Sequence, residues 1–278
     1  VNPCDWKMRE GILSDYFDVE FPVVPGFDGA GLVLAVGANV TSFASGDRVF
    51  GYVCGDKVQH GTYAELCVAP EGQLAKIPAD LSFEEAACLP IPALTVWQAL
   101  FSDTGVAPGQ NVLIHGGAGG VGSIAVQAAC QFGATVVSTS SDANRSYVMG
   151  LGAKQGFDYR SASLWQDLRR AAPQGYDVVL DSVGGDTLEQ SYGLVRPEGA
   201  LVALNQPPSP AICEARNIRC KHLIARPDGV QLAKIASLVS EKAIRLPPVK
   251  IMAMQEAPEA LKLSQRGHMR GKIVLKSE

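Results

Sequence analysis

The sequence lacks a hydrophobic run long enough to cross a membrane, and it lacks a strong excess of charge of either sign. Its most apolar stretch, ACLPIPALTVWQAL, is interrupted by Pro90 and Pro92 and falls short of the roughly 18 residues that a membrane-spanning helix needs. A net charge of −4 argues against nucleic acid or anionic lipid as a main partner. Because no secretory signal pattern is visible either, we expect a soluble, cytoplasmic protein with neither nucleic-acid nor membrane partners.

Paired cysteine spacings are also missing. Seven cysteines occur, which is an odd number, and no two of them form a C-x-x-C pair. This spacing fits neither a set of metal ligands nor a disulfide framework. We therefore expect free cysteines that act as small buried hydrophobes in a reducing compartment.

The composition predicts a globular chain of two domains. At 278 residues and 47% hydrophobic residues, the chain is long enough to form more than one core. Residues 1–92 are rich in glycine, proline and short β-branched runs such as GLVLAVG and DRVFGYV, a pattern typical of an irregular β domain. Near its end, Ser82 and Glu85 have the spacing of a capping box, which predicts a short helix that ends before Pro90.

From Asn111 onward, apolar strands and helical runs alternate. NVLIH, TVVST, GYDVVLDSV and GALVALN are the expected strands, and helical segments such as VGSIAVQAACQFG and DTLEQSYGLV separate them. This alternation predicts a parallel, doubly wound sheet over residues 93–226. Residues 227–278 contain a helix, a strand, a second helix and a last strand, and we expect them to return to the first domain and complete it.

A glycine-rich loop carries the strongest chemical signal. The sequence HGGAGGVG follows the predicted strand NVLIH and enters a predicted helix, and Gly117, Gly119 and Gly122 fit the pattern G-x-G-x-x-G. In this context glycines allow a tight turn and a close approach of the backbone to a pyrophosphate, which then meets the free N–H groups of the helix N-terminus. The loop therefore predicts a dinucleotide site. His115, at the end of the strand, is expected to hydrogen-bond the loop backbone.

The end of the next strand bears on which dinucleotide binds. A site for NAD places Asp or Glu about 20 residues after the glycines to bind the ribose hydroxyl, whereas this chain has hydroxyl side chains from Ser138 to Ser141. Hydroxyls and Arg145 would accept a 2′-phosphate that a carboxylate would repel. Asp142 is close enough to weaken this argument, but we expect it to be a helix N-cap. The sequence therefore favours NADPH over NADH.

Strings spread over nearly the whole chain resemble the medium-chain dehydrogenase/reductase superfamily. In order they are VNPCDWKMREG, PVVPGFDGAGLV, GDRVFGY, GTYAEL, LTVWQAL, VLIHGGAGGVGSIAVQAA, DVVLDSVGG and RGKIVL. The resemblance implies a Rossmann domain, a doubly wound α/β fold, joined to a GroES-like irregular β domain. It also implies that β structure normally precedes the VNP motif, so we expect the first strands of that domain to be missing here.

The chain departs from the zinc-dependent members of this superfamily at each ligand position. Asn2 stands where those enzymes have a cysteine, and Phe27 stands where they have the histidine of G-H-E. The third ligand would fall in 89–92, where only Cys88 is nearby, and the four-cysteine lobe of the structural zinc is absent. Because zinc needs three or four converging ligands, we expect no metal. The resemblance narrows to the zinc-independent quinone oxidoreductase and enoyl reductase branch.

That resemblance implies hydride transfer from NADPH to a small-molecule acceptor, a quinone or a conjugated enone or alkenal. It assigns catalytic positions to Asn2 and Tyr52 and a nicotinamide contact to Thr95. The remaining cofactor-binding positions that it implies are Gly117, Gly119, Gly120, Val121, Gly122, Ser140, Arg145, Tyr159, Arg270 and Lys272.

Several alternatives remain open at this point. Asn2 could merely cap a turn, Tyr52 could be a core aromatic, and Arg145 could be a solvated helix residue. The protein could instead reduce enoyl thioesters, or it could be a non-catalytic NADPH-binding redox sensor or structural protein. By analogy with the superfamily we expect a homodimer, with GALVALN as the edge strand.

Overall fold

The computed structural model describes residues 1–55 and 57–277, which divide into two compact units. Unit 1 consists of 1–94, 226–242 and 246–278, and unit 2 consists of 95–225 and 243–245. The C-terminal segment thus returns to the unit in which the chain begins. Within the described residues, every helix is too short or too polar to cross a membrane.

Unit 1 is built from short strands in three small sheets. β2, β3 and β5 form an antiparallel sheet in the order β2-β3-β5, while β1 pairs with β4 and β12 pairs with β13, both in parallel. Its elements are α1 (Pro3–Arg9), β1 (Asp18–Val24), β2 (Asp28–Leu32), β3 (Arg48–Tyr52), β4 (Lys57–His60), η1 (Glu71–Gln73), β5 (Leu74–Lys76), α2 (Phe83–Ala87), α9 (Gly229–Ser240), β12 (Val249–Ala253), η3 (Met254–Glu256), α10 (Ala257–Arg266) and β13 (Lys272–Lys276).

The predicted capping box at the start of α2 is confirmed. The backbone N–H of Glu85 donates to the Ser82 hydroxyl at 3.1 Å, and the Glu85 carboxylate accepts from the Ser82 N–H at 2.8 Å. These bonds satisfy two N–H groups that have no intrahelical acceptor, which is why the helix begins at this point. The next helix, α3 (Pro90–Trp97), begins at Pro90 and runs on into a π-helical segment, η2 (Gln98–Asp103).

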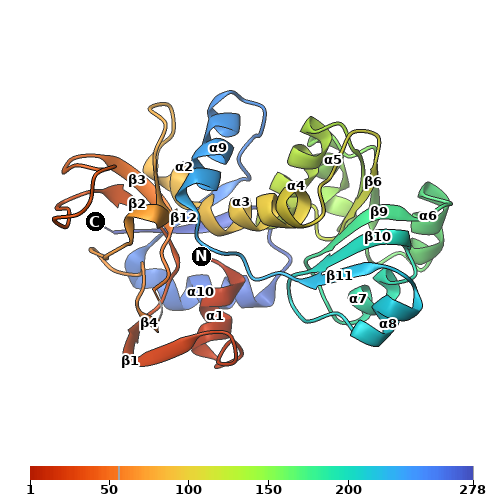
Figure 1. The fold of residues 1–278 in the computed structure, drawn as a ribbon, viewed down its shortest axis with the longest axis horizontal. Helices are drawn as coiled ribbons and strands as arrows, with labels where there is room; N and C mark the ends of the chain where they lie inside the picture. Colours follow the sequence, from red (N-terminus) through yellow and green to blue (C-terminus); the bar gives the residue numbers. More distant parts are fainter. Residues whose placement is uncertain (56, 278) are drawn as a thin grey trace. The chain divides into compact units, whose positions relative to one another are not determined.

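Unit 2 contains one six-stranded, wholly parallel sheet in the order β11-β10-β9-β6-β7-β8. Helices cover both faces, with α4 and α5 on one side and α7 and α8 on the other (Figure 1). The predicted doubly wound sheet is therefore confirmed. Its elements are β6 (Asn111–Ile114), α4 (Gly120–Gln131), β7 (Thr135–Ser140), α5 (Asp142–Gly150), β8 (Gln155–Asp158), α6 (Leu164–Ala171), β9 (Tyr176–Asp181), α7 (Asp186–Ser191), β10 (Val195–Ala203), α8 (Pro210–Ala215) and β11 (Arg219–His222).

The prediction that GALVALN is an edge strand is wrong. That segment lies in β10, which pairs with β9 on one side and with β11 on the other. β11 was not predicted, because its sequence, RCKH, has no apolar run and only four residues. The strand forms because its backbone completes the open hydrogen-bonding edge of β10, which its side chains do not reveal.

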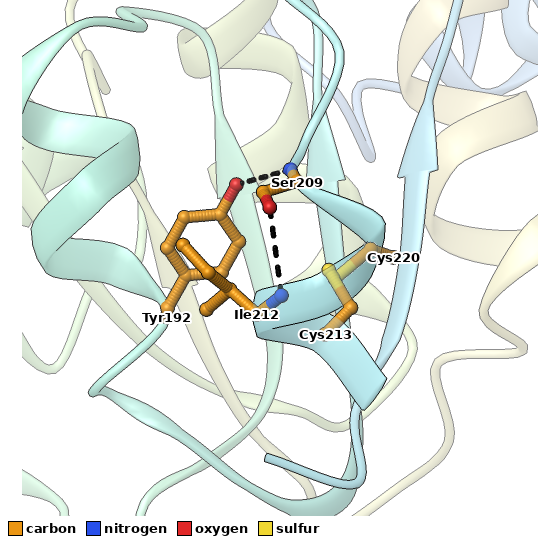
Figure 2. The surroundings of a disulfide bond; sticks show 5 residues. All are labelled: Tyr192, Ser209, Ile212, Cys213 and Cys220. Carbon is orange, nitrogen blue, oxygen red and sulfur yellow. Dashed lines mark hydrogen bonds between the residues drawn. A yellow bond between two sulfur atoms is a disulfide. The ribbon is translucent and has the colours of Figure 1, made fainter. Parts of the chain in front are cut away.

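The expectation that every cysteine is free is also wrong. Cys213 of α8 and Cys220 of β11 form a disulfide across seven positions of sequence (Figure 2). α8 is further held at its N-cap, where the backbone N–H of Ser209 donates to the Tyr192 hydroxyl at 2.7 Å and the Ser209 hydroxyl accepts from the N–H of Ile212. Of the five free cysteines, only Cys88 is fully buried.

Removing this disulfide is expected to destabilise unit 2 by about 2–3 kcal/mol, because the cross-link restricts the unfolded chain over a short loop. The change is Cys213→Ala with Cys220→Ala, and the measurement is the urea midpoint of unfolding, followed by Trp fluorescence. A reducing agent should lower the midpoint of the wild type by a similar amount and leave that of the double variant unchanged. Equal midpoints for oxidised wild type and double variant would contradict the prediction.

Candidate functional site

The glycine loop lies between β6 and α4 and closes tightly on itself. Gly116 has a φ of 76°, and its N–H donates to the Thr139 hydroxyl at 3.2 Å. A side chain at Gly117 would overlap the Ser138 hydroxyl of β7, and one at Gly122 would lie 2.7 Å from the Cα of Gly117. These two glycines are therefore required by packing between the loop, β7 and the start of α4.

Gly119 differs from them, because space is open beside it. It is the N-cap of α4, with a φ of −77° that any residue can adopt, and a Cβ there would meet the Gly116 carbonyl at an ordinary 3.5 Å. The next three residues, Gly120, Val121 and Gly122, form the first turn of the helix, and first-turn N–H groups have no intrahelical acceptor. The loop therefore presents free amides and the positive end of a 12-residue helix, which suits a pyrophosphate.

A buried histidine, His115, lies next to this loop, but its ring does not hydrogen-bond the loop backbone as predicted. The ring nitrogens of His115 bond side chains rather than the loop backbone: Nδ1 lies 3.1 Å from the Thr139 hydroxyl and Nε2 lies 3.1 Å from the Ser191 hydroxyl. Since the Ser191 hydroxyl donates to the Thr187 carbonyl, it accepts from Nε2–H, and Nδ1 then accepts from Thr139. Burial lowers the pKa of His115 to about 4, so the ring is neutral at physiological pH.

Thr139 and Ser191 were not identified from the sequence. Thr139 is the residue that joins the histidine to the loop, because its hydroxyl also accepts the N–H of Gly116. It lies in β7, next to β6 in the sheet, and Ser191 lies at the end of α7. Only the sheet order brings these three elements together, so the spacing of the residues in sequence carries no signal for this network.

Two predicted nucleotide-binding residues lie at the carboxyl ends of β7 and β8, and a third, Arg145, lies on α5, the helix that connects these strands. Ser140 is the last residue of β7, and its carbonyl accepts the N–H of Tyr159, which directly follows β8. Arg145 is exposed on α5, and its Cγ lies 3.3 Å from the position of a Cβ on Gly156 in β8. Ligands of doubly wound sheets bind at this edge.

The expectation that Asp142 is a helix N-cap is wrong. The N-cap of α5 is Ser141, and Asp142 is the first helical residue, where its charge favours the positive end of the helix dipole. Its side chain is exposed. The residues between the strand end and this helix are therefore serines, with the Asn144 amide donating to the Ser141 hydroxyl at 3.1 Å.

Unit 1 contains a second polar cluster, which is almost entirely buried. The Lys272 ammonium of β13 donates to the Asn2 side-chain oxygen at 2.5 Å and to the Val1 carbonyl at 2.8 Å. The Asn2 amide nitrogen donates to the Asp28 carboxylate at 2.7 Å, and Lys272 lies 3.8 Å from the same oxygen. The side chain of Lys272 is only 5% exposed, so the predicted cofactor residue is a partner of the predicted catalytic residue.

A second carboxylate extends this cluster. Asp5 accepts the N–H of Asn2 at 2.7 Å and the Tyr63 hydroxyl at 2.8 Å, while Asp28 also accepts the N–H of Ile91 at 2.9 Å. Burial raises the pKa of Tyr63, and the adjacent Asp5 carboxylate raises it further. Asp5, Asp28 and Tyr63 were not identified as site residues, although Asp5 and Asp28 lie in the segments VNPCDW and GFDG that carry the resemblance.

Three further predicted residues are Tyr52, Thr95 and Arg270. Tyr52 ends β3 and is buried, with its ring edge-on to that of Phe27 at 5.8 Å, and burial raises the pKa of its hydroxyl. Thr95 is buried in α3. Arg270 is exposed in the bend that precedes β13.

The donor set of unit 1 does not suit a metal ion. Across 1–55 and 57–277, no three His, Cys, Asp or Glu side chains converge in a way that could hold one. Cys88, the thiol near the third ligand position, donates to the Glu85 carbonyl at 3.0 Å, and burial raises its pKa to about 12. The positively charged ammonium of Lys272 lies beside Asn2 and Asp28 instead.

Two family models match separate segments of the chain. The model of the alcohol dehydrogenase GroES-like domain matches residues 1–79, and a model described as a zinc-binding dehydrogenase matches residues 151–275. The chain is 32% identical to 2-methylene-furan-3-one reductase of Solanum lycopersicum, over 99% of this chain and 69% of that protein. It is 34% identical to the spectinabilin polyketide synthase system protein NorB of Streptomyces orinoci, covering 88% of this chain but only 12% of NorB.

Solved structures agree with these relatives. The quinone oxidoreductase from Coxiella burnetii is 32% identical, with a TM-score of 0.85 over 100% of this chain and 87% of that one. Mycobacterial Rv1454c, solved in complex with NADPH, is 28% identical, with a TM-score of 0.87 over 99% of this chain and 88% of that one. By its two matched domains, its fold and these relatives, the protein belongs to the medium-chain dehydrogenase/reductase superfamily.

Proposed function

We propose that this protein is an NADPH-dependent oxidoreductase that transfers hydride to a quinone or a conjugated enone or alkenal without zinc. The observation that carries the proposal is the glycine loop of unit 2, with its open N-cap at Gly119 and free first-turn amides. The neighbouring strand β7 ends in serines instead of a carboxylate. When bound, the nicotinamide supplies the hydride, and the protein supplies binding, orientation and electrostatics.

The proposal assigns roles to the predicted residues. Gly119, Gly120 and Val121 bind the pyrophosphate, and Ser140, Arg145 and Tyr159 bind the 2′-phosphate. Asn2 and Tyr52 contact the acceptor, where a neutral hydrogen-bond donor suffices to stabilise charge on the oxygen of a quinone or enone. Tyr52, like an ordinary tyrosine, keeps its proton at neutral pH, and burial raises its pKa further. Thr95 and Arg270 contact the cofactor, and the protein works as a cytoplasmic homodimer.

A second candidate is reduction of enoyl thioesters. It is favoured by the similarity to NorB, a protein of a polyketide synthase system, because polyketide chains are carried as thioesters. The two candidates use the same nucleotide site and the same hydride transfer, and they differ only in the acceptor.

The test is oxidation of NADPH, followed by its near-ultraviolet absorbance, with 1,4-benzoquinone, an alkenal and a crotonyl thioester as acceptors. Turnover with quinone or alkenal supports the proposal, and turnover with the thioester alone supports the second candidate. Binding of NADPH without turnover on any acceptor would favour a non-catalytic role, and failure to bind NADPH would refute the assignment of the loop.

Substitution of Arg145 tests the choice of cofactor. Arg145→Ala is expected to raise the Kd for NADPH about tenfold, since it removes a charge-assisted hydrogen bond to the 2′-phosphate, and to leave the Kd for NADH unchanged. The measurement is quenching of protein fluorescence by each nucleotide. Lys154→Ala, which removes an exposed cation of the same unit, is the control and should affect neither. An equal loss of affinity for both nucleotides would contradict the assignment.

A further inference from the structure

The carboxamide of Asn2 has only one orientation compatible with its neighbours. An ammonium can only donate hydrogen bonds and an ionised carboxylate can only accept them. Lys272 therefore requires the Asn2 oxygen on its side, and Asp28 requires the Asn2 nitrogen. Turning the amide over would place N–H groups against the ammonium and an oxygen against the carboxylate. A neutral pair of neighbours would not impose this choice.

Each charged neighbour is itself held in place. The Lys272 ammonium also donates to the Val1 carbonyl, and Asp28 also accepts the N–H of Ile91. The N–H of Asn2 is bound by Asp5. Asn2 is thus fixed at its backbone by one carboxylate and at its side chain by an ammonium and a second carboxylate, which come from α1, β13 and β2.

We propose that Lys272 is a positioning residue: with the Asp28 carboxylate, its ammonium fixes the carboxamide of Asn2 so that the nitrogen is the donor offered to the acceptor oxygen. One amide hydrogen goes to Asp28, and the second goes to the acceptor. The ammonium also polarises the amide by binding its oxygen, which strengthens its N–H groups as donors. This inference rests on the proposed function, because it requires that Asn2 contact the acceptor.

The charges of the cluster predict how removal of the Lys272 ammonium affects the protonation of Asp28. Burial raises the pKa of Asp28, and Lys272 opposes this effect. The other titratable groups around Asp28 are Asp5, Tyr52, Tyr63, the thiols Cys4 and Cys88, and the N-terminal ammonium of Val1, which lowers the pKa of Asp28 as Lys272 does. Without the Lys272 ammonium, Asp28 takes up a proton at a higher pH. A neutral carboxyl both donates and accepts, so Asn2 is then free to turn over.

The first variant is Lys272→Met, which keeps most of the length of the side chain and removes its charge. We expect kcat at neutral pH to fall about twentyfold through misorientation of the donor, while KM for NADPH stays within about twofold. The activity of the variant should recover as the pH rises and Asp28 ionises, and that of the wild type should not. Lys276→Met is the matched control, because Lys276 lies on the same strand but is 62% exposed.

A double-variant cycle tests whether Lys272 acts through Asn2. Asn2→Leu is expected to lower kcat at least as much as Lys272→Met, and the double variant should lose no more than Asn2→Leu alone. If Lys272→Met does not fold by circular dichroism, Lys272→Gln replaces it. Glutamine removes the charge and keeps a polar group that both donates and accepts, so the directional constraint on Asn2 is lost and kcat should fall about tenfold.

The outcomes distinguish failure of the positioning role from failure of the proposed function. Additive losses in the cycle, an unchanged kcat in the Lys272 variants, or a loss confined to the KM for NADPH would overturn the positioning role alone. A wild type that turns over no acceptor would overturn the proposed function and this inference with it.

Discussion

Alanine at position 119 is expected to leave the protein fully folded and to weaken NADPH binding about a hundredfold or more. The structure explains both the retained fold and the weaker binding. A Cβ on Gly119 meets only the Gly116 carbonyl, at an ordinary 3.5 Å, and the φ of −77° suits alanine. A phosphate that approaches the N-cap backbone would instead meet the new methyl group and lose charge-assisted hydrogen bonds to the first-turn amides, each of which contributes about 1.5–3 kcal/mol.

Gly122→Ala is the matched variant, and it should fail for the opposite reason. Its Cβ would overlap the carbonyl of Gly116 and lie 2.7 Å from the Cα of Gly117, both backbone atoms that cannot move aside cheaply. We expect a loss of about 2–3 kcal/mol in unfolding free energy from overpacking. Urea unfolding and NADPH titration of both variants provide the measurement. A Gly119→Ala protein that binds NADPH normally would show that the pyrophosphate does not approach this loop.

Acidification is expected to destabilise unit 2 through His115 by up to about 3 kcal/mol. The pKa of this histidine is lowered to about 4 by burial, whereas the unfolded chain has a value near 6.5. The unfolded state therefore binds a proton first as the pH falls. The stabilising contribution is fully present above about pH 6.5, is lost progressively toward pH 4, and reaches its limit below that, as each pKa unit corresponds to about 1.4 kcal/mol.

The measurement compares urea midpoints at about pH 8 and about pH 5 for the wild type and His115→Gln. Trp165 provides a local signal, because its ring lies 6.1 Å from that of His115. The variant should lose most of the pH dependence in this window, whatever its absolute stability. His60→Gln, at an exposed position of unit 1, should keep the wild-type dependence. A His115→Gln protein with an unchanged pH profile would show that the histidine titrates normally in the folded state.

The sequence by itself was enough to predict the features that depend on neighbouring residues. The capping box at Ser82 and Glu85, the strand before the glycine loop and the helix after it are local patterns, because each is formed by groups a few residues apart. The alternation of strand and helix predicted the parallel sheet for a related reason: a right-handed crossover leaves few other topologies for such a chain.

Features that join distant segments could not be predicted in this way. Cys213 and Cys220 meet because α8 turns back onto β11, and β11 itself forms on the open edge of β10 rather than from its own side chains. His115 was expected to bind the loop directly, but β7 places the Thr139 hydroxyl between them. The error arose because sheet order, not sequence spacing, decides which side chain lies beside a strand end.

In the polar cluster of unit 1, too, some features could be predicted from the sequence and others depend on the tertiary structure. The sequence determined that the zinc ligands are replaced, since Asn2 and Phe27 stand at those positions. Only the tertiary structure decided that Lys272 is buried and bonded to Asn2, some 270 residues away in sequence. The physical reason is desolvation: a buried ammonium must find acceptors and a counter-ion, and folding supplies them from whichever segments the core brings together.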